Sequence, residues 1–187
     1  YRSKQHSGGQ GVYVRHLSAG LATLGHEVTI FSGQPYPEDL HPDVTLVQVP
    51  SLDLYRDEDP FRTPKLREFR DWIDVLEYGI MATAGFPEPV TYSLRARRLD
   101  LSGFDIVHDN QCLGYGLLSI GKRQPFVATI HQPISRDRKV DLAAASWRRK
   151  WSMFRWYGFV KMQARVARQI PTLLGVSTVS AQDAIDD

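Results

Sequence analysis

Three glycines in four residues, Gly8-Gly9-Gln10-Gly11, place the strongest constraint on how this chain folds. Glycine has no Cβ, so its backbone can adopt positive φ and lie close against a ligand. An amphipathic run over 12–24 and an apolar, β-branched run over 27–32 follow directly. Unpaired N–H groups at the start of a helix attract anions. This order predicts a glycine turn, a helix and a buried strand with a phosphate or sugar-phosphate site at the turn; a flexible entry loop is the alternative.

Runs with strand character alternate with runs at helical spacing along the whole chain. We expect strands at 27–32, 44–49, 104–108, 125–131 and 172–177, and helices at 12–24, 63–84, 90–101, 113–120, 147–169 and from 180 onward. The alternation predicts an α/β fold, a Rossmann-like, doubly wound, mostly parallel sheet with helices on both faces. Because such a glycine turn normally follows a central strand, we expect a first strand upstream of Tyr1.

The composition is that of a globular protein, with 42% hydrophobic and 24% charged residues. A length of 187 residues predicts one domain over 1–187. The single cysteine, Cys112, excludes an intrachain disulfide and fits a reducing, cytoplasmic compartment. No apolar run has the roughly 18 residues that a membrane-spanning helix needs.

Positive charge is concentrated between Arg136 and Arg168, where ten Lys and Arg residues face two Asp residues. The predicted helix over 147–169 interleaves these cations with aromatic side chains. A core helix with a solvated basic face is one interpretation. The other is contact with an anionic membrane surface or a phosphorylated substrate. No nucleic-acid-binding motif accompanies the basic residues, so we expect no nucleic-acid partner.

Polar side chains stand at the predicted carboxyl ends of two strands. His108 and then Asp109-Asn110-Gln111 follow one apolar run, and His131 ends the next. Ligands of open α/β sheets bind at this edge. A lone histidine at a strand end is more often structural, but two on neighbouring strands favour a shared cleft, with His131 the stronger candidate.

Several common sites are excluded by their missing residues. Gly9-x-Gly11-x-x-Val14 lacks the third glycine of the dinucleotide fingerprint, and no acidic residue follows the next strand. Gly116-x4-Gly121-Lys122 is followed by Arg123 where a Walker motif has Ser or Thr. No histidine has metal-ligand spacing to a cysteine or an acid, and no Gly-x-Ser-x-Gly elbow occurs, so we expect no metal, no cofactor and no serine hydrolase.

Five segments occur in order along the chain: Gly-Gly-Gln-Gly-Val-Tyr-Val-Arg-His-Leu-Ser (8–18), Leu-Gly-His-Glu-Val-Thr-Ile-Phe (24–31), Phe-Asp-Ile-Val-His (104–108), Val-Ala-Thr-Ile-His (127–131) and Gly-Val-Ser-x-x-Ser (175–180). In these segments and in their order, the sequence resembles the N-terminal domain of family 4 glycosyltransferases. These are retaining enzymes of GT-B architecture. The resemblance implies that the chain is the acceptor-side half, that a C-terminal domain binds the nucleotide sugar, and that this half alone is inactive. The family's Glu-x7-Glu motif does not occur after the last predicted strand.

The resemblance also implies roles for individual residues. Gly8 and Gly9 match the glycine loop near the donor phosphates, and His131 matches the catalytic-site histidine that reaches the transferred sugar. The acceptor side would include, by position, Asp109, Asn110, Gln111, Arg138 and Lys139.

Two functions follow as expectations. The first is transfer of a sugar, with retention, from a nucleotide sugar to an acceptor that is a sugar, a lipid-linked molecule or a phosphorylated small molecule. We expect a cytoplasmic protein, peripheral at the inner face of the membrane if the helix over 147–169 meets lipid. The second is a non-catalytic α/β module that binds anionic lipid or phosphorylated ligands.

Overall fold

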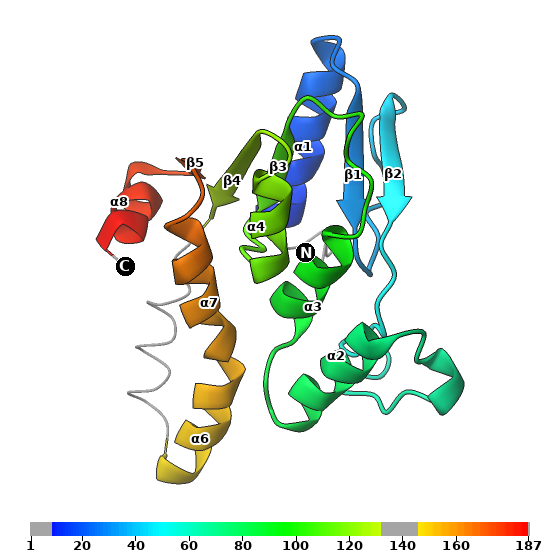
Figure 1. Cartoon of the computed structure of the whole chain (residues 1–187), viewed down its shortest axis with the longest axis vertical. Coiled ribbons are helices and arrows are strands. Elements are labelled where there is room, and N and C mark those ends of the chain that lie inside the picture. The colour runs from blue at the N-terminus through cyan, green and yellow to red at the C-terminus, as the bar shows by residue number, and fades with distance from the viewer. Residues whose placement is uncertain (1–8, 132–145, 187) are drawn as a thin grey trace. The chain divides into compact units, whose positions relative to one another are not determined.

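The computed structural model describes residues 9–131 and 146–186, and its helices and strands are labelled in Figure 1. The chain forms two compact units, residues 1–68 and 69–187, which we describe one at a time. Both contain parallel strands connected to helices, which confirms the predicted Rossmann-like α/β class. Within the described residues, no helix is both long enough and apolar enough to cross a membrane.

The first unit is built from one helix and two parallel strands. Helix α1 spans Gly9–Thr23, strand β1 spans Val28–Ser32 and strand β2 spans Val44–Gln48. The strands pair in register from Val28 with Val44 to Ser32 with Gln48. Gly25 ends the helix turn as expected: its φ is 88° and its N–H donates to the Ala22 carbonyl at 2.9 Å.

The glycine stretch is helical where it is described. Helix α1 already begins at Gly9, and Gly11 is buried in its first turn, so the prediction of a loop over these two residues is wrong. Glycine's positive-φ freedom is therefore not used at Gly9. Gly8 lies outside the described residues. Strand β1 is also less buried than predicted, since only Ser32 among its residues is fully buried.

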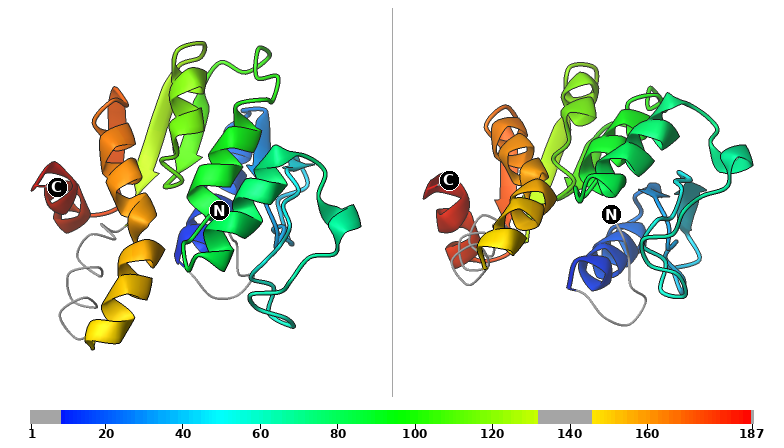
Figure 2. Two further views of the ribbon diagram at one scale, coloured as in Figure 1. Left: turned by 60° about the horizontal axis from the view of Figure 1, so that its bottom comes forward. Right: turned by 90° about the horizontal axis from the view of Figure 1, so that it is seen from below.

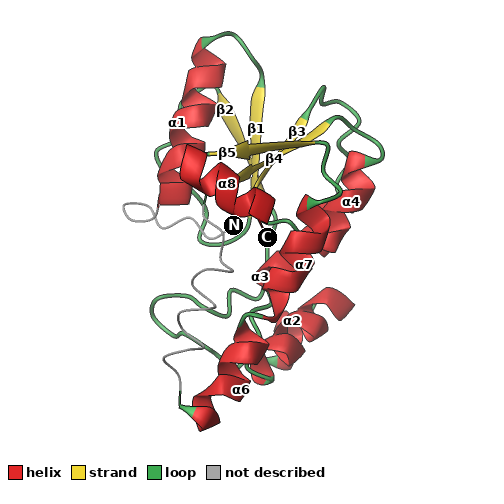
Figure 3. Ribbon diagram, turned by 90° about the vertical axis from the view of Figure 1, so that its left-hand side faces the viewer, coloured by secondary structure: helices red, strands yellow, loops and turns green. Residues whose placement is uncertain are grey.

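The second unit holds a three-stranded parallel sheet in the order β3-β4-β5. Its strands are β3 (Val107–Asn110), β4 (Phe126–Ile130) and β5 (Thr172–Gly175). Its helices are α2 (Trp72–Ala82), α3 (Glu88–Ala96), α4 (Tyr115–Gly121), α6 (Trp147–Trp156), α7 (Gly158–Ala167) and α8 (Thr178–Asp186). Helix α8 lies on the other side of these strands from α4 and α7, as Figures 2 and 3 show.

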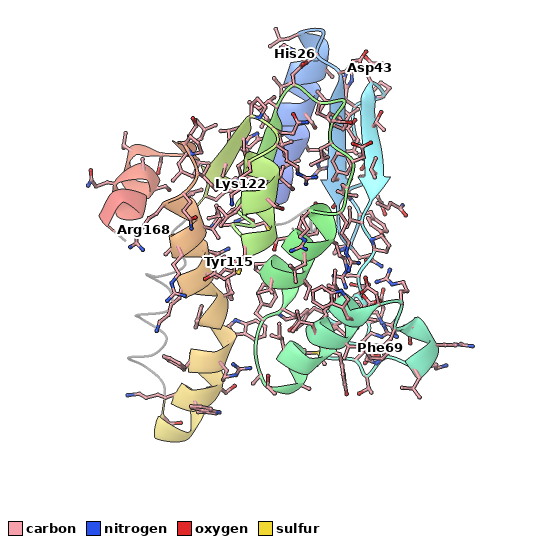
Figure 4. The ribbon with its side chains drawn as sticks, viewed as in Figure 1. His26, Asp43, Phe69, Tyr115, Lys122 and Arg168 are labelled. Atoms are coloured by element: carbon pink, nitrogen blue, oxygen red, sulfur yellow. The ribbon has the colours of Figure 1, made fainter. Side chains whose placement is uncertain are left out.

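Small residues allow the helices of this unit to pack closely. A Cβ added at Gly116 of α4 would lie 2.1 Å from the carbonyl oxygen of Ser93 in α3. A Cβ at Gly175, at the end of β5, would lie 2.8 Å from the Ala181 side chain in α8. Side-chain contacts complete the packing: Arg165 of α7 donates to the Tyr115 hydroxyl of α4 at 3.3 Å, and Figure 4 shows Tyr115 beside α7.

Two predicted helices differ from the structure. The helix expected over 63–84 begins only at Trp72, because Asp71 caps it by accepting hydrogen bonds from the N–H groups of Ile73 and Asp74. Residues Leu66–Glu68 form a short 3-10 helix instead, and Leu66 is 90% exposed. The helix expected over 147–169 is broken at Tyr157, whose ψ of 12° is not helical, into α6 and α7.

The predicted boundaries around β3 are also corrected. Strand β3 starts three residues later than expected and includes Asp109 and Asn110, so these side chains belong to the strand and do not follow it. The preceding helix, α3, ends at Ala96 and not at Leu101. All four residues of β5 are exposed, and among the described strands β5 pairs with β4 alone.

Helix α2 buries acidic side chains where a core helix usually buries apolar ones. Asp74 and Glu77 are 1% and 2% exposed, and both accept hydrogen bonds from Arg95 of α3. Arg70 donates twice more to Asp74, from Nε and Nη2, at 2.8 Å each. Burial opposes ionisation of Asp74, but the bonds from Arg70 and Arg95 outweigh it and hold its pKa at about 2. Ion pairs therefore join α2 to α3.

We expect Asp74→Ala to lower the free energy of unfolding by about 3 kcal/mol, because it leaves the Arg95 guanidinium buried without one of its carboxylates. Denaturant titration measures this. Asp59→Ala, which removes the exposed partner of Arg56, is the control and should cost less than about 1 kcal/mol. Equal, small effects of both variants would contradict the role assigned to the buried pair.

Candidate active site at the carboxyl ends of β3 and β4

His131 follows the last residue of β4 and is held by the end of β3. The parallel register places Asn110 of β3 opposite Thr129 of β4, two residues before His131. Side chains two residues apart on a strand point to the same face, so Asn110 and His131 can meet across the pair. Asn110 Oδ1 lies 2.6 Å from His131 Nε2. The imidazole is therefore positioned by the neighbouring strand.

The main chain of His131 is fixed as well. Its N–H donates to Gln111 Oε1 at 2.7 Å, and its carbonyl accepts from the Ser180 hydroxyl of α8 at 2.9 Å. Three elements thus hold one residue: the last residue of β3, the turn after it and helix α8. Rigid support of this kind keeps a functional side chain in place without a cost at each reaction cycle.

Gln111 itself occupies an unusual backbone conformation. Its φ is 58°, in the left-handed region that costs a residue with a Cβ about 1 kcal/mol or more. Gln163 of α7 stabilises this turn by donating from Nε2 to the carbonyls of Gln111 and Cys112, at 3.2 and 3.1 Å. The turn directs the Gln111 side chain to the His131 N–H.

Asp109 is engaged within the same turn. It is 7% exposed, and its two carboxylate oxygens accept from the N–H groups of Cys112 and Leu113, at 3.2 and 2.9 Å. Burial raises its pKa to about 6, although those two hydrogen bonds partly oppose the rise. The predicted contact between Asp109 and an acceptor stays a prediction.

His108 lies on the same face of β3 as Asn110, two residues earlier. Its Nε2 is 2.6 Å from the hydroxyl of Thr129 in β4. Burial lowers the pKa of His108; burial and then the nearby His108 lower the pKa of His131. Both shifts favour the neutral imidazole. His108 is the second residue of β3 and not, as predicted, its last.

The other predicted site residues divide into described and undescribed ones. Gly9 opens α1 and is exposed, and no other described segment has an atom within 4 Å of the place where its Cβ would stand. Gly8, Arg138 and Lys139 lie outside the described residues. Among the described residues, no three His, Cys, Asp or Glu side chains gather as metal ligands would. That the reaction needs no metal or cofactor stays a prediction.

Sequence reasoning missed two residues that support the site, Gln163 and Ser180. The last helix was expected from 180 onward, but α8 begins at Thr178, and Ser177 caps it by accepting the Ser180 N–H at 3.0 Å. The Ser180 hydroxyl is thereby available to reach His131. The one sequence feature that could have indicated a role for Ser180 was its place at the end of the segment Gly-Val-Ser-x-x-Ser (175–180). Gln163 gave none, because a glutamine in a basic helix looks like a solvated residue.

The basic, aromatic segment predicted as one helix over 147–169 has features of both interpretations given above. Trp156 of α6 and Phe159 of α7 pack against Phe86, with ring centroids 5.1 and 5.3 Å apart, as core residues do. Trp151 and Phe154, three residues apart on α6, are 73% and 46% exposed. Exposed cations, among them Arg149, Lys150 and Lys161, accompany them. The segment therefore has both a core part and an exposed aromatic, basic part.

Because burial lowers their pKa, His108 and His131 should titrate below their values in the same chain unfolded in urea. As the pH falls, the two histidines therefore bind protons at a higher pH in the unfolded state than in the folded state. The stability contributed by these two neutral rings is complete above about pH 6.5 and is lost as pH falls through the folded-state pKa values. Histidine NMR titration of folded and unfolded chain checks this, and equal or higher folded midpoints would contradict it.

Two comparisons with known proteins agree with the resemblance found in the sequence. The model of Glycosyltransferase Family 4 matches residues 7–186. A protein of Mycolicibacterium hassiacum named MMP alpha-(1->4)-mannosyltransferase is 63% identical over 192 residues. The match covers 100% of this chain and 46% of that relative, so the chain spans less than half of the relative's length.

Proposed function

Since this chain belongs to glycosyltransferase family 4, we propose that the protein containing it transfers a mannosyl group, with retention, from a nucleotide sugar to an acceptor. The choice of mannose and of an α-(1→4) linkage follows the name of the 63% identical relative. The acceptor is a sugar, a lipid-linked molecule or a phosphorylated small molecule. The chain forms the acceptor-side domain, and a second domain supplies the donor site; the 46% coverage of the relative supports this division.

The observation that carries the proposal is the support of His131 by three elements. A neutral imidazole fixed at the carboxyl end of a parallel strand stands where open α/β sheets bind ligands. In a retaining transfer, positive charge develops on the sugar and negative charge on the departing diphosphate. A fixed histidine orients the sugar by hydrogen bonds without forming a covalent bond to it.

Gly9 supports the part of the proposal that concerns the donor phosphates. It exposes the first N–H groups of α1, where unpaired donors and the helix dipole favour an anion. No other described segment comes within 4 Å of its missing Cβ, which is compatible with a ligand lying close to the backbone. In this proposal Gly8 and Gly9 bind the donor phosphates through their N–H groups, which would stabilise the charge that forms on the departing diphosphate in the transition state. On the acceptor side we propose Asp109, Asn110, Gln111, Arg138 and Lys139.

We expect the full-length protein to transfer mannose from at least one nucleotide-mannose in a panel of nucleotides, with α-linked products identified by NMR. His131→Ala should lower kcat about tenfold or more, a loss of at least about 1.4 kcal/mol in transition-state stabilisation, while the far-UV circular dichroism is unchanged. The matched control is His26→Ala, at an exposed histidine after α1, which should leave kcat unchanged. Absence of transfer from every donor would contradict the proposed function, and an unchanged kcat in His131→Ala would remove that residue from the site.

A second, non-catalytic role is favoured by the exposed rings of Trp151 and Phe154 on α6. Aromatic side chains with nearby Lys and Arg suit the interface of an anionic membrane. Lys161 of α7 lies 5.6 Å from the centroid of the Phe154 ring, so charge and aromatic surface are adjacent. We propose that this surface docks the protein, as a peripheral cytoplasmic one, on the inner face of the membrane.

The membrane role predicts that the protein sediments with vesicles containing anionic phosphatidylglycerol and not with neutral phosphatidylcholine vesicles. Replacing both Trp151 and Phe154 by Ser should reduce the bound fraction several-fold. Leu24→Ser, at a residue 75% exposed in the first unit, is the control and should bind as the wild type does. Equal sedimentation with both kinds of vesicle would contradict the role of α6.

A further inference from the structure

The contact between Asn110 and His131 determines more than the position of the imidazole. Histidine has two neutral tautomers, and the partner of one ring nitrogen decides which nitrogen carries the hydrogen. Asn110 Oδ1, 2.6 Å from His131 Nε2, is an acceptor only. A hydrogen bond between them therefore requires the hydrogen on Nε2, which makes Nδ1 the acceptor of the ring.

We propose that Asn110 is a positioning residue that fixes His131 as the Nε2–H tautomer, and that it acts in sugar transfer through His131. The inference rests on the proposed function, in which His131 orients the transferred sugar. A neutral Nδ1 accepts a hydrogen bond from a sugar hydroxyl, whereas an imidazolium or the other tautomer would donate from Nδ1 to the hydroxyl oxygen. The tautomer therefore sets the direction of the hydrogen bond and, with it, how the hydroxyl is oriented.

The surroundings of the pair support a functional reason for it. Asn110 Nδ2 is buried and has no hydrogen-bond partner among the described residues. An unpaired buried donor is a cost to stability, so the amide is poorly explained by its contribution to the fold. Gln111 and Ser180 hold the His131 main chain on either side, which fixes the backbone position from which the ring reaches Asn110.

The groups that face the ring fit a neutral histidine. The neighbouring titratable residue on β3 is His108, whose Nε2 is bonded to the Thr129 hydroxyl. Helix α8 contributes the uncharged Ser180. The nearest carboxylate along β3, that of Asp109, is bonded to the N–H groups of Cys112 and Leu113. Asn110 is an uncharged acceptor, which selects a tautomer without favouring the protonated ring.

Two variants of the full-length protein test the role. Asn110→Ala should lower kcat about tenfold while the denaturation midpoint changes little. In the His131→Ala background it should have no further effect, since residues that act as one unit are not additive. Asn110→Asp keeps the acceptor but adds a charge, so the acid limb of the kcat profile should move up by about 1 to 2 pH units. Activity should return at higher pH.

The matched control is Gln124→Ala. Gln124 carries a side-chain amide and lies just before β4, at the amino ends of the strands of the same sheet. It donates to the Leu101 carbonyl at 3.0 Å. Its loss removes a similar buried bond but should leave kcat and the pH profile within twofold of the wild type. An effect of Asn110→Ala no larger than that of Gln124→Ala in an active protein would overturn the proposal.

A second readout does not depend on catalysis. Nitrogen-15 chemical shifts of labelled histidine distinguish the tautomers, and His131 should be the Nε2–H form in the wild type and a mixture in Asn110→Ala. A wild type without transferase activity would refute the proposed function, yet the shifts would still test the assignment of Asn110. A His131 protonated on Nδ1, or shifts identical in both proteins, would overturn it.

Discussion

The parallel pairing of β3 with β4 is the constraint on which the candidate site depends. Its register sets Asn110 opposite Thr129 and so brings Asn110 beside His131, although the two residues are 21 positions apart in the chain. A shift of one residue would turn every side chain of the strand to the other face. Asn110 would then lie on the far side of the sheet, and His131 would lose its partner. The chemistry of the site is thus a consequence of backbone hydrogen bonding.

The turn after β3 is held by hydrogen bonds and supports the main chain of His131. Asp109 accepts two N–H groups of the turn, and Gln163 donates to two of its carbonyls, so the positive φ of Gln111 is held from both sides. The same unit joins α2 to α3 through buried ion pairs of Asp74 and Glu77 with Arg95. Both arrangements place polar groups in the interior, where each must be paired to be tolerated.

The sequence predicted the fold class and the order of its elements, because strand and helix periodicity and Gly25, the glycine that follows α1, are local signals. The role of His131 stays a prediction. The sequence did not predict the start of α2 at Trp72. There the cap at Asp71 and the buried ion pairs outweigh the apolar spacing that begins at Leu66. Ser180 could not be recognised as a support of His131, since their contact depends on how α8 packs on the sheet. Non-local contacts of this kind have no pattern in a single sequence.

The central claim is that His131 orients the sugar that is transferred. It is tested most directly by a crystal structure of the full-length protein with a non-hydrolysable nucleotide-mannose. The account predicts a hydroxyl of the mannosyl ring within hydrogen-bond distance, about 2.6 to 3.2 Å, of His131 Nδ1, with Nε2 still bonded to Asn110. A donor bound productively with its sugar out of contact with His131 would contradict it.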